Sequence, residues 1–238
     1  MKVKRFIKKC CKKMNSLVES IKEKVSRKRE YNIYDTAVLI KDPLPSTINF
    51  QDTIDELKKT IPSSYFSLID VIYIGKFDFE EDGFTGKYMD GAIYLTNDQD
   101  DAMDIVDDVI HEISHALEDS YGGLIYGDGS IIDEFLSKRK VLERYLRHTG
   151  FDTNGLDFKE LNYDKKLDDF LFKKVGYDYI NKTFSGNLFL NAYSITNLRE
   201  YFAIGFEKYY MESRREIDFI TPKLYEKLVE LENYLEDN

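Results

Sequence analysis

The sequence predicts an α+β fold that is mostly helical and has a small mixed sheet. Apolar residues recur at steps of three and four through most of the second half of the chain, which is the pattern of helices that bury one face. Two short runs, residues 71–74 and 91–95, have instead the length and the β-branched or aromatic composition of buried strands. The chain has 238 residues, of which 42% are hydrophobic, so it is long enough for one sizeable core or for a domain with an appendage.

Turn-forming and helix-breaking residues divide the body of the chain into elements. The β-forming residues at 31–41 predict a strand or an extended connector. A helix is expected at 52–60, where Pro62 ends it, and a short helical turn at 65–69. A polar, glycine-bearing loop at 79–90 separates the two buried strands. Further elements are expected as helices at 130–147, 163–179, 197–214 and 222–235, and as a loop at 150–163.

The first 30 residues form a separate unit by charge. Residues 1–29 contain twelve Lys or Arg and two Glu, a net charge of +10, although the whole chain carries −10. Their apolar side chains recur at helical spacing, so we expect a basic amphipathic helix (residues 1–30) joined to an acidic domain (residues 31–238). This helix could pack on the domain or on a second copy, attach to an anionic membrane surface with Cys10 and Cys11 as acylation sites, or bind nucleic acid or another acidic partner.

The acidic domain carries the remaining charge, which is strongly negative. It should therefore repel nucleic acid and anionic lipid, and basic or neutral peptides are the substrates expected for it. Cys10 and Cys11 are adjacent, which is a poor geometry for bonding each other, so no disulfide framework is expected. The sequence shows no uninterrupted apolar segment of a secretory signal and no stretch near the roughly 20 apolar residues of a membrane span. A cytoplasmic or peripheral membrane location is therefore expected.

The motif with the clearest chemistry is H-E-x-x-H, formed by His111, Glu112 and His115. Residues four apart on a helix lie one turn apart on the same face, so the two imidazoles can converge on one metal ion. Glu112 lies beside them, where it can take a proton from a nucleophilic water as a general base. Such a motif also arises by chance on solvated helices, but the chain has only three His and two of them have this spacing.

A well-bounded helix is predicted around this motif. Asn97 and Asp98 are candidate N-caps, acidic residues follow in the first turns, and Gly122 with Gly123 supplies a stop. Apolar side chains between residues 103 and 117 recur at helical spacing. One face of this helix is therefore expected to be buried.

Two histidines do not complete a catalytic zinc site, which usually has three protein ligands and a water. The remaining histidine, His148, ends a predicted helix and is interpreted as favourable C-terminal charge rather than as a ligand. Glu200 is the better candidate, because it lies in an aromatic and apolar segment where an unpaired carboxylate would be costly to bury. The alternatives are that Glu200 pairs with a Lys or Arg or points to water.

Residues 111–119 and 197–206, together with Tyr193, resemble the catalytic domain of the anthrax toxin lethal factor family, which includes the clostridial Pro-Pro endopeptidases. The resemblance covers roughly residues 31–238, is specific at these two motifs, and extends to residues 220–225. It is weak between the motifs.

The resemblance implies a zincin-like metallopeptidase domain of the gluzincin type, with Zn²⁺ held by His111, His115 and Glu200. It also implies that Glu112 is the general base. Tyr193, seven residues before Glu200, would assist catalysis, and a hydrogen bond to the developing oxyanion is the role expected of it.

The strand expected at residues 91–95 is the candidate edge strand that lines the substrate cleft. At the edge of a zincin cleft, an extended peptide adds itself to such a strand through backbone hydrogen bonds. Gly91, Ala92, Ile93 and Tyr94 are therefore the candidate substrate-binding residues. An ordinary core strand is the alternative.

The chain departs from this family between His115 and Tyr193, where it is longer than the smaller members by about one helix and its loop. This helical insertion, around residues 125–163, could reshape the cleft or cover it. The substrate preferences of the family are therefore not carried over.

The sequence thus predicts a zinc-dependent metalloendopeptidase that acts on a protein or peptide substrate. The alternative is a membrane-surface or partner-binding protein that acts through the basic N-terminal helix and keeps a structural or vestigial zinc site. The presence of Glu112 favours the enzyme, because a structural site needs no carboxylate beside the water. A toxin-like effector or a phage-encoded protease is a further idea that rests on family analogy alone.

Overall fold

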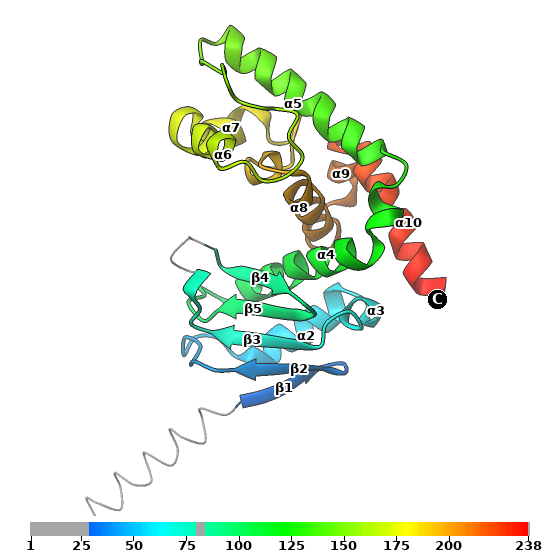
Figure 1. The fold of residues 1–238 in the computed structure, drawn as a ribbon. Coiled ribbons are helices and arrows are strands. Elements are labelled where there is room, and N and C mark those ends of the chain that lie inside the picture. Colours follow the sequence, from blue (N-terminus) through cyan, green and yellow to red (C-terminus); the bar gives the residue numbers. More distant parts are fainter. Residues whose placement is uncertain (1–28, 80–83, 238) are drawn as a thin grey trace, which may run out of the picture.

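A computed structural model of the chain describes residues 29–79 and 84–237. A small sheet forms one end of this part of the chain, helices form the other end, and helix α4 lies between them (Figure 1). The predicted α+β class, with more helix than strand and a small mixed sheet, is confirmed. The predicted basic helix, with Cys10 and Cys11, lies outside the described residues except for its last two positions, which already belong to the first strand.

The sheet has five strands among the described residues, in the spatial order β1-β2-β3-β5-β4. β1 and β2 form an antiparallel hairpin, β2, β3 and β5 are parallel, and β4 is antiparallel to β5. The strands are β1 (Arg29–Ile33), β2 (Thr36–Ile40), β3 (Val71–Gly75), β4 (Gly86–Met89) and β5 (Ala92–Thr96). The two predicted buried strands are therefore confirmed as β3 and β5.

The strand β4 lies in the segment that was predicted to be a loop, and that prediction is wrong at residues 86–89. β4 is joined to β5 by the two-residue turn Asp90-Gly91, and both of these residues have positive φ, 49° and 80°. Such turns match the twist of a hairpin, and Asp-Gly is a favoured pair for them. The Asp-Gly dipeptide was thus the sequence signal for this hairpin.

Helices α2 (Phe50–Thr60) and α3 (Ser63–Phe66) follow the hairpin β1–β2, and α4 (Ala102–Tyr126) follows β5. The N-cap of α4 is Asp101, so the prediction of Asn97 or Asp98 is wrong. The Asp101 side chain accepts a hydrogen bond from the backbone N–H of Asp104, and the Asp104 side chain accepts one from the backbone N–H of Asp101. This reciprocal capping box satisfies two donors that a helix start otherwise leaves free.

Helix α4 also continues past the predicted stop at Gly122 and Gly123, with one non-helical residue at Tyr121. A glycine inside a helix costs only about 1 kcal/mol relative to alanine. The buried Ile125 and a hydrogen bond from the Tyr126 hydroxyl to Glu118 hold the last turn in place and offset that cost.

The helical end of the molecule contains the remaining elements. They are α5 (Ser130–His148), α6 (Lys165–Phe170), η2 (Leu171–Val175), α7 (Tyr177–Phe184), η3 (Tyr193–Ile195), α8 (Leu198–Met211), α9 (Arg214–Ile220) and α10 (Pro222–Asp237). The continuous helix predicted at 163–179 is wrong, because the chain breaks at Gly176, where φ is 88°.

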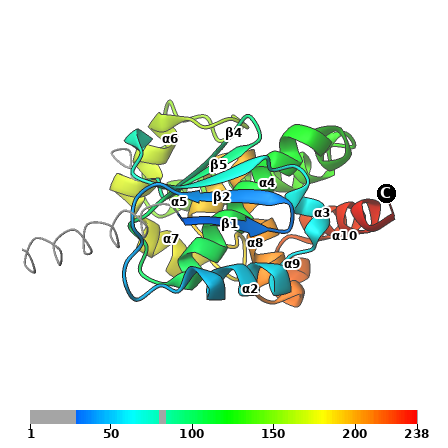
Figure 2. The same cartoon turned by 90° about the horizontal axis from the view of Figure 1, so that it is seen from below.

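The long helix α4 packs against β4 and β5 on one side and along α8 on the other. The helical end therefore approaches the sheet at its β4 edge, and β1 and β2 lie at the opposite edge, nearest the viewer in Figure 2. None of the described helices is long and apolar enough to cross a membrane. The H-E-x-x-H segment lies in the middle of α4, so this packing places it where the sheet meets the helices.

Candidate metal centre

The three predicted metal ligands come together where α4 and α8 pack. His111 and His115 lie one turn apart on α4, and Glu200 lies in the first turn of α8. His111 Nε2 is 3.2 Å from Glu200 Oε2, and His115 Nε2 is 3.9 Å from Glu200 Oε1. One ligand atom from each residue lies within 4.8 Å of the other two. This group could hold a metal ion.

The environment of Glu200 fits a bound cation. Its Oε2 atom is buried and has no hydrogen-bond partner of good geometry, although His111 Nε2 lies 3.2 Å away. A buried carboxylate oxygen without a donor is costly. A cation bound between the carboxylate and the two imidazoles would remove that cost, and two imidazoles with one carboxylate form a common donor set for transition metals.

The charges in this group also favour a cation. Burial raises the pKa of Glu200, but His111 and His115 outweigh burial and lower it. Burial lowers the pKa of His111, but Glu200 and Glu207 outweigh burial and hold it well above its ordinary value. Because an imidazole binds a metal ion only through an unprotonated nitrogen, metal binding is expected to release a proton from His111.

Each histidine is held by a carboxylate on the ring nitrogen that points away from Glu200. His111 Nδ1 is 3.3 Å from Glu207 Oε2, and His115 Nδ1 is 2.9 Å from Glu118 Oε2. Such carboxylates fix the ring orientation and tautomer of metal-bound histidines and make them better ligands. Sequence reasoning missed both residues, although the spacing of Glu118 three residues after His115 was a usable signal.

Glu118 is itself held in a buried network. Its side chain is 4% exposed, and its Oε2 atom lies 3.3 Å from Arg199 Nε on α8. The Tyr126 hydroxyl donates to its other oxygen. Arg199, next to Glu200 in the sequence, thus joins the start of α8 to α4 beside the candidate metal ligands.

Glu112, the predicted general base, lies buried between α4 and β4. The backbone N–H of Tyr88 donates a hydrogen bond to its carboxylate. Gly86 leaves room for it, since a Cβ at that position would lie only 2.8 Å from Glu112 Oε1. Burial raises the pKa of Glu112, while the two histidines His111 and His115 oppose the rise. A carboxylate with a raised pKa is a better proton acceptor at neutral pH.

Tyr193 lies in the short helix η3, half-buried, and lines the same hollow as His111, Glu112 and Glu200. Burial, followed by the charge of Glu200, raises the pKa of Tyr193, so its hydroxyl keeps its proton. A protonated hydroxyl at this place can donate a hydrogen bond into the hollow.

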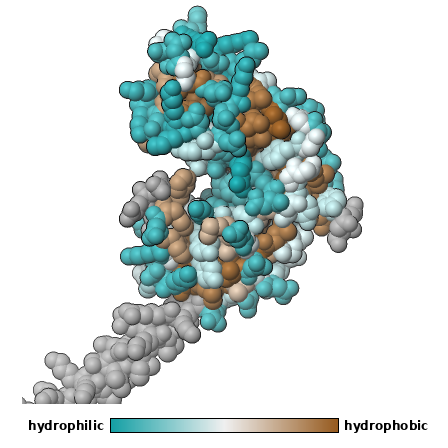
Figure 3. All heavy atoms as spheres, in the orientation of Figure 1, coloured by the Kyte–Doolittle hydropathy of each residue, from teal (hydrophilic) through white to brown (hydrophobic). Residues whose placement is uncertain are grey.

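Two adjoining hollows of about 600 and 610 Å³ meet at this centre. The walls that they share are Phe84, Gly86, His111, Glu112, Tyr163 and Tyr193. Together they form a cleft between the sheet end and the helical end, where the surface of the molecule is visibly hollowed (Figure 3). Of residues 125–163, the segment that was predicted to be an insertion, only Asn162 and Tyr163 line this cleft, so helix α5 does not cover it.

The edge strand of the sheet is β4 and not β5, so the prediction for Gly91, Ala92, Ile93 and Tyr94 is wrong in its premise. Gly91 is a turn residue, and the other three belong to β5, which is paired with β3 on one side and β4 on the other. The backbone of β5 therefore cannot accept another strand. The candidate edge strand for a substrate is therefore residues 86–89, which had been predicted to be part of a loop.

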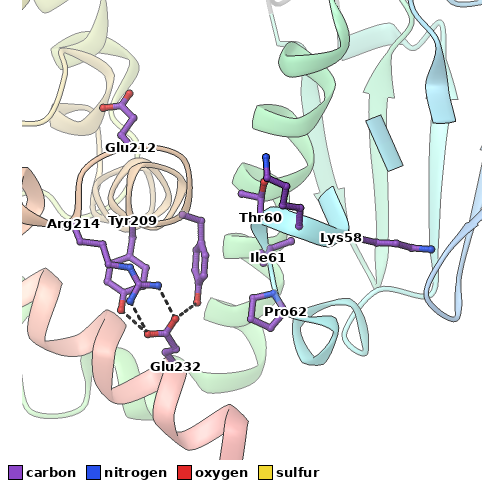
Figure 4. A pocket seen from close by; sticks show the side chains of 10 residues that line it. Lys58, Thr60, Ile61, Pro62, Tyr209, Glu212, Arg214 and Glu232 are labelled. Atoms are coloured by element: carbon purple, nitrogen blue, oxygen red, sulfur yellow. Dashed lines mark hydrogen bonds and ion pairs between the residues drawn. The ribbon is translucent and has the colours of Figure 1, made fainter. Parts of the chain in front are cut away.

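A further hollow, of about 520 Å³, lies away from this centre between the end of α2 and helices α8 and α10 (Figure 4). Glu232 is its central charged group, and it accepts hydrogen bonds from the hydroxyl of Tyr209 and from both terminal nitrogens of Arg214. The guanidinium also stacks 3.9 Å from the Tyr209 ring centroid. This satisfied network ties α10 to α8 and to the start of α9, which is a structural role.

Comparison with protein-family models, with curated proteins and with solved structures gave no match.

Proposed function

We propose that the protein is a zinc-dependent metalloendopeptidase, with Zn²⁺ bound by His111, His115 and Glu200. The observation that carries the proposal is the convergence of these three side chains beside Glu112, with an anionic carboxylate behind each imidazole. Two His and one Glu form a ligand set of catalytic zinc sites, which keep one position open for water or substrate. The open cleft at this centre supports a catalytic rather than a structural site.

The proposal includes a zincin-like domain of the lethal factor-like type. It is supported by a mixed sheet with an antiparallel edge strand, by a helix that carries both histidines, and by a second helix that carries the glutamate. The Tyr193 hydroxyl on the wall of the same cleft agrees with the role that the sequence resemblance implies.

Zinc, when bound, would lower the pKa of water and polarise the scissile carbonyl group. The chain supplies the proton transfers: Glu112 accepts a proton from the attacking water and then delivers it to the leaving amine. Tyr193 donates a hydrogen bond to the carbonyl oxygen as negative charge develops on it. Removing one such donor in comparable enzymes costs about 3 kcal/mol of transition-state stabilisation.

The edge of β4 that pairs with no other described strand is the proposed binding site for the substrate backbone. Thr96 N–H donates to Thr85 C=O, so the backbone groups of Thr85 point toward β5. Because successive residues of an antiparallel strand alternate in direction, the backbone groups of residue 87 also point toward β5, and those of Gly86 and Tyr88 point outward. The outward N–H of Tyr88 is already bonded to Glu112. Both backbone groups of Gly86 and the carbonyl of Tyr88 are then the groups that would pair with an extended peptide.

The test is Glu112→Gln, which preserves size but removes the base. We expect zinc content to stay at one ion per chain and peptide cleavage to fall by a factor of about 10² to 10⁴. Elemental analysis gives the zinc content, and a peptide library read by mass spectrometry gives the cleavage. The matched control is Glu226→Gln, on the exposed face of α10, which should change neither quantity.

Two results would contradict the proposal. One is cleavage that survives in Glu112→Gln. The other is a zinc content that is absent in the wild type or unaffected by Glu200→Ala, because the proposed site needs that third ligand.

A further inference from the structure

The insertion around residues 125–163 contains an arginine that is entirely enclosed by the protein. Arg139 on α5 has 0% exposure, and its guanidinium lies 4.6 Å from the ring centroid of Phe135. Within the described residues, no carboxylate lies at ion-pair distance from it. Burying an unpaired cation is expensive, so the hydrogen bonds of the guanidinium must offset the cost of burying its charge.

The guanidinium of Arg139 bonds only to backbone carbonyl groups. Nε and Nη2 both donate to Ile195 C=O, Nη2 also donates to Thr196 C=O, and Nη1 donates to Glu160 C=O, over distances of 2.5 to 2.8 Å. Burial lowers the pKa of Arg139 to about 10, so the side chain still carries its charge at neutral pH. The planar fork of an arginine spreads five N–H donors over a wider span than the single ammonium of a lysine, so it can bond carbonyl groups that lie on different segments.

These carbonyl groups belong to segments that build the cleft. Ile195 ends the short helix that carries Tyr193. Thr196 precedes Asn197, the N-cap of α8, whose side chain accepts a hydrogen bond from the backbone N–H of Glu200 at 3.0 Å.

The third carbonyl group belongs to the loop that forms the far wall of the cleft. Glu160 lies two residues before Asn162 and three before Tyr163, both of which line the cleft. The same loop is tied to α8 directly, since Leu198 N–H donates to Leu161 C=O at 2.8 Å.

We propose that Arg139 is a positioning residue of the active centre, which holds the Tyr193 turn, the start of the Glu200 helix and the cleft wall at residues 160–163 in one arrangement. The insertion then acts as the support behind the third zinc ligand and the tyrosine hydroxyl. The inference rests on the proposed function, because it assigns Arg139 to the zinc centre of that function. A geometry held in advance by the protein lets zinc bind without first ordering this segment.

The adjacent residue Lys138 offers a matched control. It is also buried, at 8% exposure, and its ammonium bonds two carbonyl groups, those of Leu188 and Ile220. Neither carbonyl group belongs to a residue that lines the cleft. Lys138→Met therefore removes a buried, backbone-bonded cation from the same helix without removing a hydrogen bond to the segments that Arg139 holds. Its contact with α8 is the ring of Tyr201, whose centroid lies 6.0 Å from the ammonium.

The first experiment compares Arg139→Lys, Arg139→Gln and Lys138→Met with the wild type. Zinc affinity is measured by chelator competition, the ligand geometry by the visible spectrum of the Co²⁺-substituted protein, and stability by urea unfolding. We expect the Arg139 variants to bind zinc at least tenfold more weakly and to show an altered Co²⁺ spectrum, and kcat to fall more than KM changes. Lys138→Met should lose stability but keep zinc affinity within twofold and the wild-type Co²⁺ spectrum.

Unchanged zinc affinity and an unchanged Co²⁺ spectrum in folded Arg139→Lys and Arg139→Gln would overturn the proposal and leave Arg139 with a stabilising role alone. A wild type that binds no zinc would instead refute the proposed function itself, which separates the two failures. Metal binding and the Co²⁺ spectrum can be read even if no cleaved peptide is found.

A second measurement needs no variant. Amide hydrogen exchange of the metal-free wild type should show residues 193–200 already protected, and zinc should add little to that protection. Rapid exchange there that zinc suppresses would mean that the metal orders the segment, and it would overturn the positioning role of Arg139.

Discussion

Replacing Glu207 with glutamine tests whether the carboxylate behind His111 serves the metal centre. Glu207 Oε2 is 3.3 Å from His111 Nδ1, on the side of the ring opposite Glu200. Glutamine keeps the size and a hydrogen-bonding oxygen but removes the charge that makes the imidazole a stronger ligand. Glu207→Gln should therefore weaken zinc binding while the fold is kept.

The expected magnitude follows from the geometry. Loss of a carboxylate of this kind costs about 10- to 100-fold in metal affinity, which corresponds to about 1.4 to 2.7 kcal/mol of binding free energy. The 3.3 Å separation is long for a charge-assisted bond, and the side chain is 23% exposed. We therefore expect the lower end, about tenfold. The corresponding bond from Glu118 to His115 is shorter and more buried, so Glu118→Gln should cost more.

The assay is competition for zinc with a chromophoric chelator at constant pH, which yields the ratio of dissociation constants. The matched control is Glu212→Gln at the end of the same helix, where the carboxylate pairs with Lys208 and is 49% exposed. Its zinc affinity should equal that of the wild type. A Glu207→Gln affinity within twofold of the wild type would refute the reasoning.

Three further predictions concern packing and charge. Gly86→Ala places a Cβ 2.8 Å from Glu112 Oε1, so peptide cleavage should fall at least about tenfold. Elemental analysis should still find zinc. An unchanged kcat/KM would count against the placement of Glu112 as the base. Gly205→Ala places a Cβ 2.2 Å from Leu224 Cδ2, and overpacking between α8 and α10 should lower the free energy of unfolding by about 1–3 kcal/mol. Equal urea midpoints for Gly205→Ala and the wild type would contradict this prediction. Burial and neighbouring acids raise the pKa of Asp107 from 3.8 to about 6, so its ionisation reduces stability as the pH rises from about 4 through 6. Asp107→Asn should then be more stable than the wild type at pH 7.5 and not at pH 4, and urea midpoints that shift equally at both pH values would disprove this.

Much of the fold could be predicted because its signals are local. The helices α2, α5 and α10 and the strands β3 and β5 follow from the spacing of apolar residues and from helix-breaking residues that end them. Some errors arose where a tertiary contact or a cap outweighed the local pattern, and others where a local signal was missed, at the Asp90-Gly91 turn and at Gly176. The clearest case is α4, which begins at its Asp101 capping box and passes two glycines before it ends.

The candidate site likewise has residues that local sequence patterns predict and residues that only the packing of the helices brings into place. The spacing of His111 and His115 settles their relative positions, because one helical turn separates them whatever the rest of the chain does. Glu200 was identified by the cost of burying a carboxylate and by resemblance, and the packing of α8 along α4 places it beside the histidines. Glu207 had no such signal, because the residue it holds lies 96 positions away.

The sequence by itself determined the helices α2, α5 and α10, the strands β3 and β5 and the H-E-x-x-H group, since each depends on residues within a few positions of one another. The tertiary structure alone decided which strand forms the edge of the sheet, which carboxylates hold the histidines, and what supports the turn that carries Tyr193. Those features join segments far apart in the chain, such as Arg139 and Ile195. Their contacts depend on how the elements pack, which no local periodicity encodes.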